Sequence, residues 1–337
     1  MDTKILQPQD IEIGARLIKN GELVGMPTET VYGLGADALN GTAVANIFKA
    51  KGRPMDNPLI VHIAKIEDVY RLTSDFSDKA RLLAEHFWPG PLTIVMPKSE
   101  VIPNEVSAGL DTVAIRYPSH PVAEALILAA DTPIAAPSAN LSGSPSPTTA
   151  NHVFKDLKGK IPAIIDGGQC EVGLESTVIT VAEGVPRLLR PGGVTLEEIE
   201  GVIGKIQVDN GVMNKLAEGA RVSSPGMKYK HYAPKAHVML IKASSCKYTD
   251  YVNSNKGNGV GALCFDEDIK ALNVPYITLG RADDYISQAH NLFDALRSLD
   301  KMGLTAVYAH CPKPTGVGLA VYNRVIRSAG FEVTTLE

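Results

Sequence analysis

Cysteine is scarce in this sequence, and the few cysteines present are far apart. Among the 337 residues there are four cysteines, and no two of them form a C-x-x-C pair. A zinc site or a disulfide framework depends on closely spaced thiols, so neither is predicted and the thiols are expected to be reduced. The four residues are Cys170, Cys246, Cys264 and Cys311.

Long apolar runs and a recognisable targeting segment are also lacking. No run approaches the ~20 apolar residues that span a bilayer, so no membrane-spanning segment is predicted. Residues 1–4 (MDTK) do not begin a basic-then-apolar signal. Together with the reduced thiols, these features lead us to expect a cytoplasmic protein.

Positive charge is not in excess. The sequence has 33 Lys and Arg against 37 Asp and Glu, for a formal net charge of -4. A surface that binds nucleic acid without sequence preference must neutralise many phosphates, and this balance argues against such a surface. A small local basic cluster remains possible, so an RNA such as tRNA could still bind, although nothing in the composition requires it.

Several common catalytic signatures are missing as well. The sequence has no Walker A loop, no H-E-x-x-H and no G-x-G-x-x-G with a clear acidic partner. Nucleophilic, zinc and classical NAD chemistry therefore lose support. The remaining segments are basic, rich in hydroxyl groups and lined by glycine. Such segments suit a reaction that depends on positioning and on charge neutralisation at phosphate.

The length predicts two domains. Residues 1–204 alternate short apolar runs with helical patterns, which indicates an α/β domain around a twisted sheet. Residues 205–236 have turn and basic residues but little periodicity, and are predicted to be a connector. Residues 237–337 alternate strands and helices and are predicted to form a smaller Rossmann-like α/β domain.

The first two candidate segments surround the first predicted strand and helix. Residues 27–35 combine hydroxyls, a carboxylate and glycines where the strand over 23–26 ends, and they are predicted to form a turn that either binds a ligand or caps the next helix. Lys51 and Arg53 follow the helix predicted over 42–50. They suit a polyphosphate, or else a solvated basic helix end. The nearby Asn57 and His62 favour the functional interpretation.

Three further segments have comparable side chains. Arg116 ends an apolar strand and suits a carboxylate clamp or a structural salt bridge. Residues 135–143 are small and hydroxyl-bearing, which suits a ligand against the backbone or a plain loop. Residues 175–177 precede a strand, and Arg187 and Arg190 follow it.

Taken in order along the chain, these segments resemble the YrdC-like family. The resemblance covers most of residues 10–200 and rests on the joint match, because each segment alone is weak. The segments are 27–34 (PTETVYGL), 51–54 (KGRP), 58–59 (PL), 88–93 (WPGPLT), 116–118 (RYP) and 137–140 (PSAN). Residues 224–234 (SPGMKYKHYAP) look like the long, two-domain form of the family.

The resemblance implies a YrdC-like twisted mixed sheet with helices around a concave cleft. It also implies a nucleotidyltransferase that converts L-threonine, bicarbonate or CO2, and ATP to L-threonylcarbamoyl-AMP and pyrophosphate. The product would serve N6-threonylcarbamoyladenosine formation at position 37 of tRNA, completed by a separate transferase complex. Mg²⁺ would enter with ATP rather than in a protein cage.

The resemblance also assigns residues. Those implied to be catalytic are Lys51, Arg53, Ser138 and Asn140. Those implied to hold L-threonine are Thr30, His62, Arg116, Ala136 and Ser176. Those implied to hold ATP are Arg53, Asn57, Thr112, Ser138, Ser146, Arg190 and Tyr232. Residues 224–234 are expected to cover the cleft as a lid, with Lys228, Lys230, His231 and Tyr232 meeting the triphosphate. The second domain is expected to position this lid.

Three alternatives remain at this point. An RNA-binding module would use the same basic cleft, and the net charge speaks against it. A carbamoyl transferase of hydrogenase maturation would also have zinc fingers, and no C-x-x-C is present. A regulatory relative without catalysis would not need the intact set of Lys51, Arg53, Ser138 and Asn140.

Overall fold

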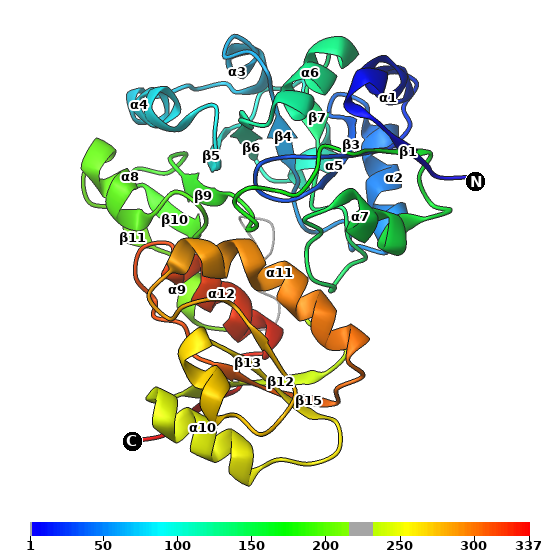
Figure 1. The fold of residues 1–337 in the computed structure, drawn as a ribbon. Helices are drawn as coiled ribbons and strands as arrows, with labels where there is room; N and C mark the ends of the chain where they lie inside the picture. The colour runs from blue at the N-terminus through cyan, green and yellow to red at the C-terminus, as the bar shows by residue number, and fades with distance from the viewer. Residues whose placement is uncertain (1, 216–231) are drawn as a thin grey trace. The chain divides into compact units, whose positions relative to one another are not determined.

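The computed structural model describes residues 2–215 and 232–337, which form two compact units (Figure 1). The first unit contains most of residues 2–215. The second contains residues 232–337 together with two short stretches, 143–145 and 172–174. Lys228, Lys230 and His231, and most of the predicted lid, lie outside the described residues.

The first unit is built on one mixed sheet. Within the described residues its eleven strands follow the order β1-β8-β2-β3-β7-β4-β6-β5-β9-β10-β11. The strands are β1 (Lys4–Leu6), β2 (Val24–Met26), β3 (Gly33–Asp37), β4 (Ile60–His62), β5 (Leu92–Pro97), β6 (Thr112–Arg116), β7 (Ile134–Ala135), β8 (Ala163–Ile165), β9 (Thr177–Thr180), β10 (Arg187–Arg190) and β11 (Gln207–Val208). Pairs β4·β6 and β5·β9 are parallel, whereas β4·β7 and β5·β6 are antiparallel.

The helices of this unit are short. They are α1 (Ile11–Lys19), α2 (Gly41–Lys51), α3 (Asp68–Leu72), α4 (Asp78–Phe87), α5 (Asn104–Ser107), α6 (Pro121–Ala130), α7 (Ala150–Leu157), α8 (Leu196–Ile203) and α9 (Asn210–Met213). Helix α2 matches the predicted helix closely because its ends are encoded locally. The Asn40 side chain accepts a hydrogen bond from the Ala43 N–H, and Gly52 ends the helix in the left-handed region at φ 62°.

Some predicted boundaries were wrong. The segment through Gly33 and Gly35, predicted as a turn, is strand β3, paired antiparallel with β2 and β7. Glycine fits this strand because a Cβ on Gly35 would lie 2.8 Å from Ile134 Cγ2. The first part of the predicted connector also has regular structure, since β11 pairs with β10 and α9 follows it.

The two faces of this sheet are covered differently. On one face, a large core joins buried side chains of α2, α4 and α5 to the strands. On the other face, α1 and α6 pack on β1, β8, β2 and β7. Over the remaining half of that face, a small apolar cluster contains strand residues alone: Ile60, Val95, Ala114, Val178 and Leu189. Among the described core clusters, this half of the face therefore has no helix packed on it, and we call it the open half-face.

The second unit is a doubly wound parallel sheet in the order β14-β13-β15-β12-β16. Its elements are β12 (His237–Lys242), α10 (Ser245–Ser254), β13 (Val260–Cys264), η2 (Asp266–Ala271), β14 (Tyr276–Thr278), α11 (Tyr285–Lys301), β15 (Ala306–His310), α12 (Gly318–Ser328) and β16 (Val333–Thr335). Alternating strands and helices predicted this arrangement. The mixed first sheet and the parallel second sheet confirm the predicted α/β class.

Two short stretches that lie among residues 2–215 belong to the second unit. The Arg297 guanidinium on α11 donates to the Pro145 carbonyl at 2.6 Å. Gly173, at φ 78°, lies so close to α11 that a Cβ would be 2.6 Å from the His290 Cα. Only glycine allows that conformation and that approach without strain. Within the described residues, no helix is long and apolar enough to cross a membrane.

Candidate functional site

A row of polar side chains borders the apolar cluster of the open half-face. His62 lies beyond Ile60 on β4, and Arg116 beyond Ala114 on β6, where the two residues are register partners. Residues two apart on a strand share a face, so both side chains belong to the same face as the cluster. Thr93, two residues before Val95 on β5, continues the row. The strand register thus gathers side chains that are far apart in the sequence.

Arg116 is buried and fixed by three neighbours. Its Nε donates to the Gly90 carbonyl at 3.2 Å, its Nη1 to Thr30 Oγ1 at 2.8 Å and its Nη2 to Glu29 Oε1 at 2.6 Å. The structural salt bridge to Glu29 is therefore present in the polar row, and the carboxylate clamp stays a prediction. The turn that presents Glu29 and Thr30 is held by Thr28, whose Oγ1 donates to the Val31 carbonyl at 2.6 Å.

Ser176 forms the neighbouring part of the row. Its Oγ lies 2.7 Å from Thr93 Oγ1, and Arg190 donates to the Ser176 carbonyl at 3.1 Å and to Ser176 Oγ at 3.2 Å. All three side chains are buried. This confines Ser176 Oγ to one position between a hydroxyl and a guanidinium. The structure thus brings together Ser176 and Arg190, which the sequence placed 14 residues apart.

His62 is held in its neutral form. Burial, reinforced by the positive charge of Arg116, lowers the pKa of His62 to about 3. Its Nδ1 is buried without a hydrogen-bond partner in the described structure. A neutral imidazole has one donor and one acceptor nitrogen. His62 Nδ1 can therefore donate or accept one hydrogen bond with a hydroxyl group, depending on the tautomer.

A second group of predicted residues lies around the end of α2. Lys51 is buried, and its Nζ donates to the Ser138 and Asn140 carbonyls, both at 2.5 Å. Ser138 Oγ donates to Asn140 Oδ1 at 2.6 Å, and the Gly33–Ser138 bridge joins this loop to β3. Lys51 was predicted to face phosphate. The structure shows Lys51 holding the 138–140 loop, and its role at phosphate stays a prediction.

Arg53 lies next to this group. Its Nη2 donates to the Asn57 and Pro58 carbonyls, both at 3.2 Å, and its guanidinium carbon lies 6.0 Å from the centre of the Phe48 ring. Asn57 is buried and its Oδ1 has no hydrogen-bond partner. Ala136 follows β7, and its N–H donates to the Ile60 carbonyl at 2.9 Å, which places it beside β4.

Two other residues that were predicted to bind ATP, Thr112 and Ser146, also belong to the first unit. Thr112 begins β6, four residues before Arg116, so the two α-carbons are about 13 Å apart along the strand. It lines a cavity of about 240 Å³ together with Val95, Thr180 and Arg187. The apolar cluster therefore lies between Arg116 and Thr112. Ser146 is buried, and its Oγ donates to Glu175 Oε1 at 2.5 Å.

Tyr232, a third residue that was predicted to bind ATP, belongs to the second unit. It is buried at φ 63°, with its ring 5.3 Å from the Phe293 ring and 5.6 Å from the Arg324 guanidinium. Its predicted role with ATP stays a prediction.

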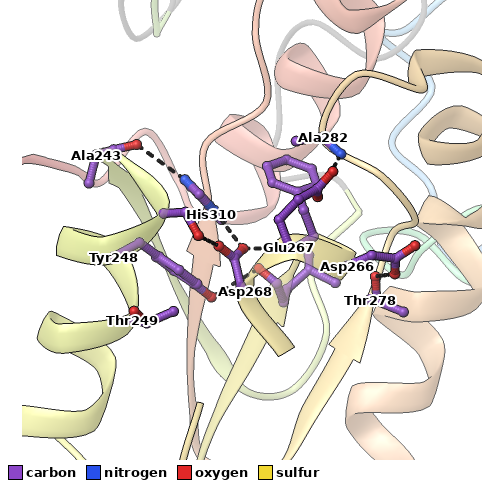
Figure 2. A network of polar contacts seen from close by, with 12 residues as sticks. Ala243, Tyr248, Thr249, Asp266, Glu267, Asp268, Thr278, Ala282 and His310 are labelled. Atoms are coloured by element: carbon purple, nitrogen blue, oxygen red, sulfur yellow. Dashed lines mark hydrogen bonds and ion pairs between the residues drawn. The ribbon is translucent and has the colours of Figure 1, made fainter. Parts of the chain in front are cut away.

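The second unit contains a network of polar contacts around Asp268 and His310 (Figure 2). Asp268 accepts from His310 Nδ1 at 2.7 Å, from the Phe265 N–H at 3.0 Å and from Ser245. Desolvation alone would raise the pKa of Asp268, but these hydrogen bonds outweigh it and lower the pKa. Ser245 donates to Asp268 rather than to His310, so the order of groups differs from a nucleophilic triad. We regard this network as structural.

Sequence reasoning assigned no role to Glu29, Thr93 and Glu175, which contact Arg116, Ser176 and Ser146 respectively. A usable signal existed for Glu29, a carboxylate enclosed by threonines and apolar residues in 27–35. Among the residues that the structure describes, no group of three His, Cys, Asp or Glu side chains could hold a metal ion.

The fold and the gathered polar row define the YrdC-like class of α/β proteins, here with a second, doubly wound unit. Comparison with known families agrees on both parts. A family model described as "Telomere recombination" matches residues 16–192, and one described as "Threonylcarbamoyl-AMP synthase, C-terminal domain" matches residues 194–330. The chain belongs to the threonylcarbamoyl-AMP synthase family.

Individual relatives are similar over nearly the whole chain. Threonylcarbamoyl-AMP synthase of Pyrococcus abyssi is 47% identical over 332 residues, which is 96% of this chain and 95% of the relative. The protein of that name from Bacillus subtilis is 47% identical over 323 residues, 95% of this chain and 92% of the relative. The crystal structure of P. abyssi Sua5 complexed with L-threonine superimposes with a TM-score of 0.92 at 45% identity, covering 100% of both chains.

Proposed function

We propose that this protein is an L-threonylcarbamoyladenylate synthase. It combines L-threonine, bicarbonate or CO2, and ATP into L-threonylcarbamoyl-AMP and pyrophosphate. The observation that carries the proposal is the polar row around Arg116. It is supported by the similarity of the chain, over its full length, to a relative crystallised with L-threonine. The product supplies N6-threonylcarbamoyladenosine formation in tRNA through a separate transferase complex.

L-Threonine binds along the polar row in this proposal. Arg116 faces the carboxylate, because a guanidinium offers parallel N–H groups that fit two carboxylate oxygens. Thr30, Ser176 and the neutral His62 surround the remainder of the amino acid, and Ala136 closes one side. Burial of these groups favours the proposal, since their hydrogen bonds to a ligand form away from competing water.

The group around Lys51 takes the phosphates. Lys51, Arg53, Ser138 and Asn140 combine two cations with a hydroxyl and an amide, a donor set suited to phosphate oxygens. The contacts of Lys51 with the 138–140 loop support this placement, because they hold Lys51, Ser138 and Asn140 in one arrangement before any ligand binds.

The nucleoside part lies across the apolar cluster. Thr112 and the 240 Å³ cavity stand on the far side of that cluster from Arg116, which leaves an apolar floor between the two polar ends. A purine ring fits such a floor because its faces are weakly hydrated. Asn57, Ser146, Arg190 and Tyr232 complete the proposed ATP contacts.

The chemistry follows from positioning. The threonine amine bonds to the carbon of CO2 and gives a carbamate, and a carbamate oxygen then attacks the α-phosphorus while pyrophosphate leaves. Holding both reactants in one cleft turns an encounter of separate molecules into a step within a complex. Lys51 and Arg53 offset the charge that develops on the phosphate oxygens.

Mg²⁺ is proposed to arrive with ATP, held chiefly by phosphate oxygens and water, as magnesium commonly is at nucleotide sites. The donors around Lys51 fit the phosphates rather than a divalent cation. The proposed domains are 1–204 for catalysis, 205–236 as connector and 237–337 as the Rossmann-like part. We place the protein in the cytoplasm, where its substrates and tRNA are found.

Incubation with ATP, bicarbonate and L-threonine tests the function directly. We expect mass spectrometry to detect threonylcarbamoyl-AMP, and pyrophosphate release to stop when L-threonine is omitted. Pyrophosphate release that is independent of L-threonine would refute the assignment.

The phosphate contacts are tested by Lys51→Ala and Arg53→Ala. Each is expected to slow turnover by about 10²–10³-fold, equivalent to ~2.7–4 kcal/mol of lost transition-state stabilisation. Lys49→Ala is the matched control, because Lys49 is an exposed residue of the same helix. Turnover near that of the control in both variants would show that these cations do not act on phosphate.

A further inference from the structure

Glu29 is a buried carboxylate, and within the described residues only one of its two oxygens accepts a hydrogen bond. The residue is 4% exposed. Its Oε1 accepts from Arg116 Nη2 at 2.6 Å, whereas its Oε2 is buried without any hydrogen-bond partner among residues 2–215 and 232–337. The turn that presents Glu29 is fixed by Thr28, so the unused oxygen does not result from a loose loop.

An unused carboxylate oxygen in a protein interior calls for an explanation. A buried acceptor that lacks a donor forfeits the hydrogen bonds it made in water, and most buried polar atoms in native proteins have partners. Nothing in the packing around Arg116 needs the second oxygen, because Oε1 alone completes the ion pair. A ligand with an N–H or O–H group would supply the missing donor.

The surroundings indicate which donor it is. Arg116 has five N–H groups, of which three are used by Gly90, Thr30 and Glu29. An acceptor therefore lies directly beside a cation that retains donor capacity. A molecule with an ammonium group next to a carboxylate has the complementary arrangement, and this is the common part of every α-amino acid.

We propose that Glu29 Oε2 accepts a hydrogen bond from the α-amino group of the substrate, while Arg116 contacts its carboxylate. This assignment rests on the proposed function and adds a residue to it. It gives the site selectivity for an amino acid over the same acid without the amino group, because a ligand without the amine leaves Oε2 buried and unpaired. The same contact fixes the nitrogen that must bond to the carbon of CO2.

The test combines a substitution of Glu29 in the protein with removal of the amino group from the ligand. Binding of L-threonine and of (R)-3-hydroxybutanoate, which lacks only the amino group, is measured by calorimetry for the wild type and Glu29→Gln. Glutamine keeps an oxygen for Arg116 but places an N–H₂ donor where the amine would donate. We expect Glu29→Gln to weaken L-threonine binding roughly 10- to 100-fold and to change hydroxybutanoate binding less than 3-fold.

Two further variants complete the design. Glu85→Gln removes an exposed carboxylate from α4 and should leave both affinities unchanged. Glu29→Asp keeps the charge with a shorter side chain, and is expected to bind L-threonine with an affinity between those of the wild type and Glu29→Gln. It also provides the comparison should Glu29→Gln fail to fold, as judged by its circular dichroism.

The outcomes separate the possibilities. Equal losses for both ligands would show that Glu29 only orients Arg116, and would overturn the proposal. Unchanged L-threonine binding in a folded Glu29→Gln would overturn it as well. Failure of the wild type to bind L-threonine would instead refute the proposed function. The proposal is supported only when the loss is confined to the ligand that has the amine.

Discussion

Acid should destabilise the first unit through His62. The folded protein holds the pKa of His62 at about 3, against about 6.5 for an unfolded chain. Below pH 6.5 the unfolded chain therefore binds a proton that the folded protein rejects until the pH approaches 3. The free energy of unfolding is therefore not reduced by His62 above pH 6.5, and it falls as the pH is lowered from 6.5 towards 3. Between pH 7.5 and 5.0 the linkage relation gives a loss of about 2 kcal/mol from this one residue.

The assay is urea unfolding followed by tryptophan fluorescence. The sequence has one tryptophan, Trp88, whose indole N–H donates to the Leu92 carbonyl at 2.7 Å at the start of β5. The signal therefore reports the first unit and not the second, so a transition of one unit can be analysed by itself. With a urea m-value of ~2 kcal/mol per molar, a loss of 2 kcal/mol lowers the midpoint by about 1 M.

His62→Gln isolates the effect, because glutamine does not titrate. The variant is expected to lose about 2 kcal/mol less than the wild type over the same pH change, whatever its stability at pH 7.5. Equal pH dependence in the two proteins would refute the reasoning, and would mean that His62 accepts a proton as readily in the folded state as in water.

Two further predictions concern the second unit. Gly173→Ala should lower the thermal stability of this unit by more than about 2 kcal/mol, because the new Cβ meets the α11 backbone. Gly303→Ala, in the same unit, has open space and adds only about 1 kcal/mol of strain at its positive φ. Equal losses in the two variants would contradict the packing argument. Asp268→Asn should remove about 1.5–3 kcal/mol, because it replaces the charged acceptor of the hydrogen bonds from His310 and the Phe265 N–H. Hydrogen exchange on β13 and β15 measures this loss, while Asp283→Asn, in an exposed pair with Arg281, changes little. Similar exchange in both would show that the buried pair is not a source of stability.

Local sequence predicted the helices and strands whose signals lie within a few residues. Helix α2 is an example, with a side-chain cap at Asn40 and a left-handed glycine at its end. The second unit was predicted for the same reason, because its strands and helices alternate plainly. Strand β3 was missed because Gly33 and Gly35 are typical of turns, and only the close approaches of Ala136 to Gly33 and of Ile134 to Gly35 explain them.

Residue chemistry was also visible in the sequence. Clusters of Lys, Arg, hydroxyl and amide side chains indicated anion binding, and their order along the chain indicated the family. The sequence left the role of Arg116 open between a carboxylate clamp and a structural salt bridge. That choice depends on Glu29 and Thr30, which are 87 and 86 residues away.

The sequence alone therefore determined the class of fold and the family, and it supplied the candidate side chains for the chemistry. The tertiary structure decided which of them meet. It placed Lys51 against the Ser138 and Asn140 carbonyls, set Thr112 across an apolar floor from Arg116, and left one oxygen of Glu29 buried without a donor. The physical reason is that caps and periodicity act over a few residues, whereas strand register joins segments whose separation in the chain has no local signature.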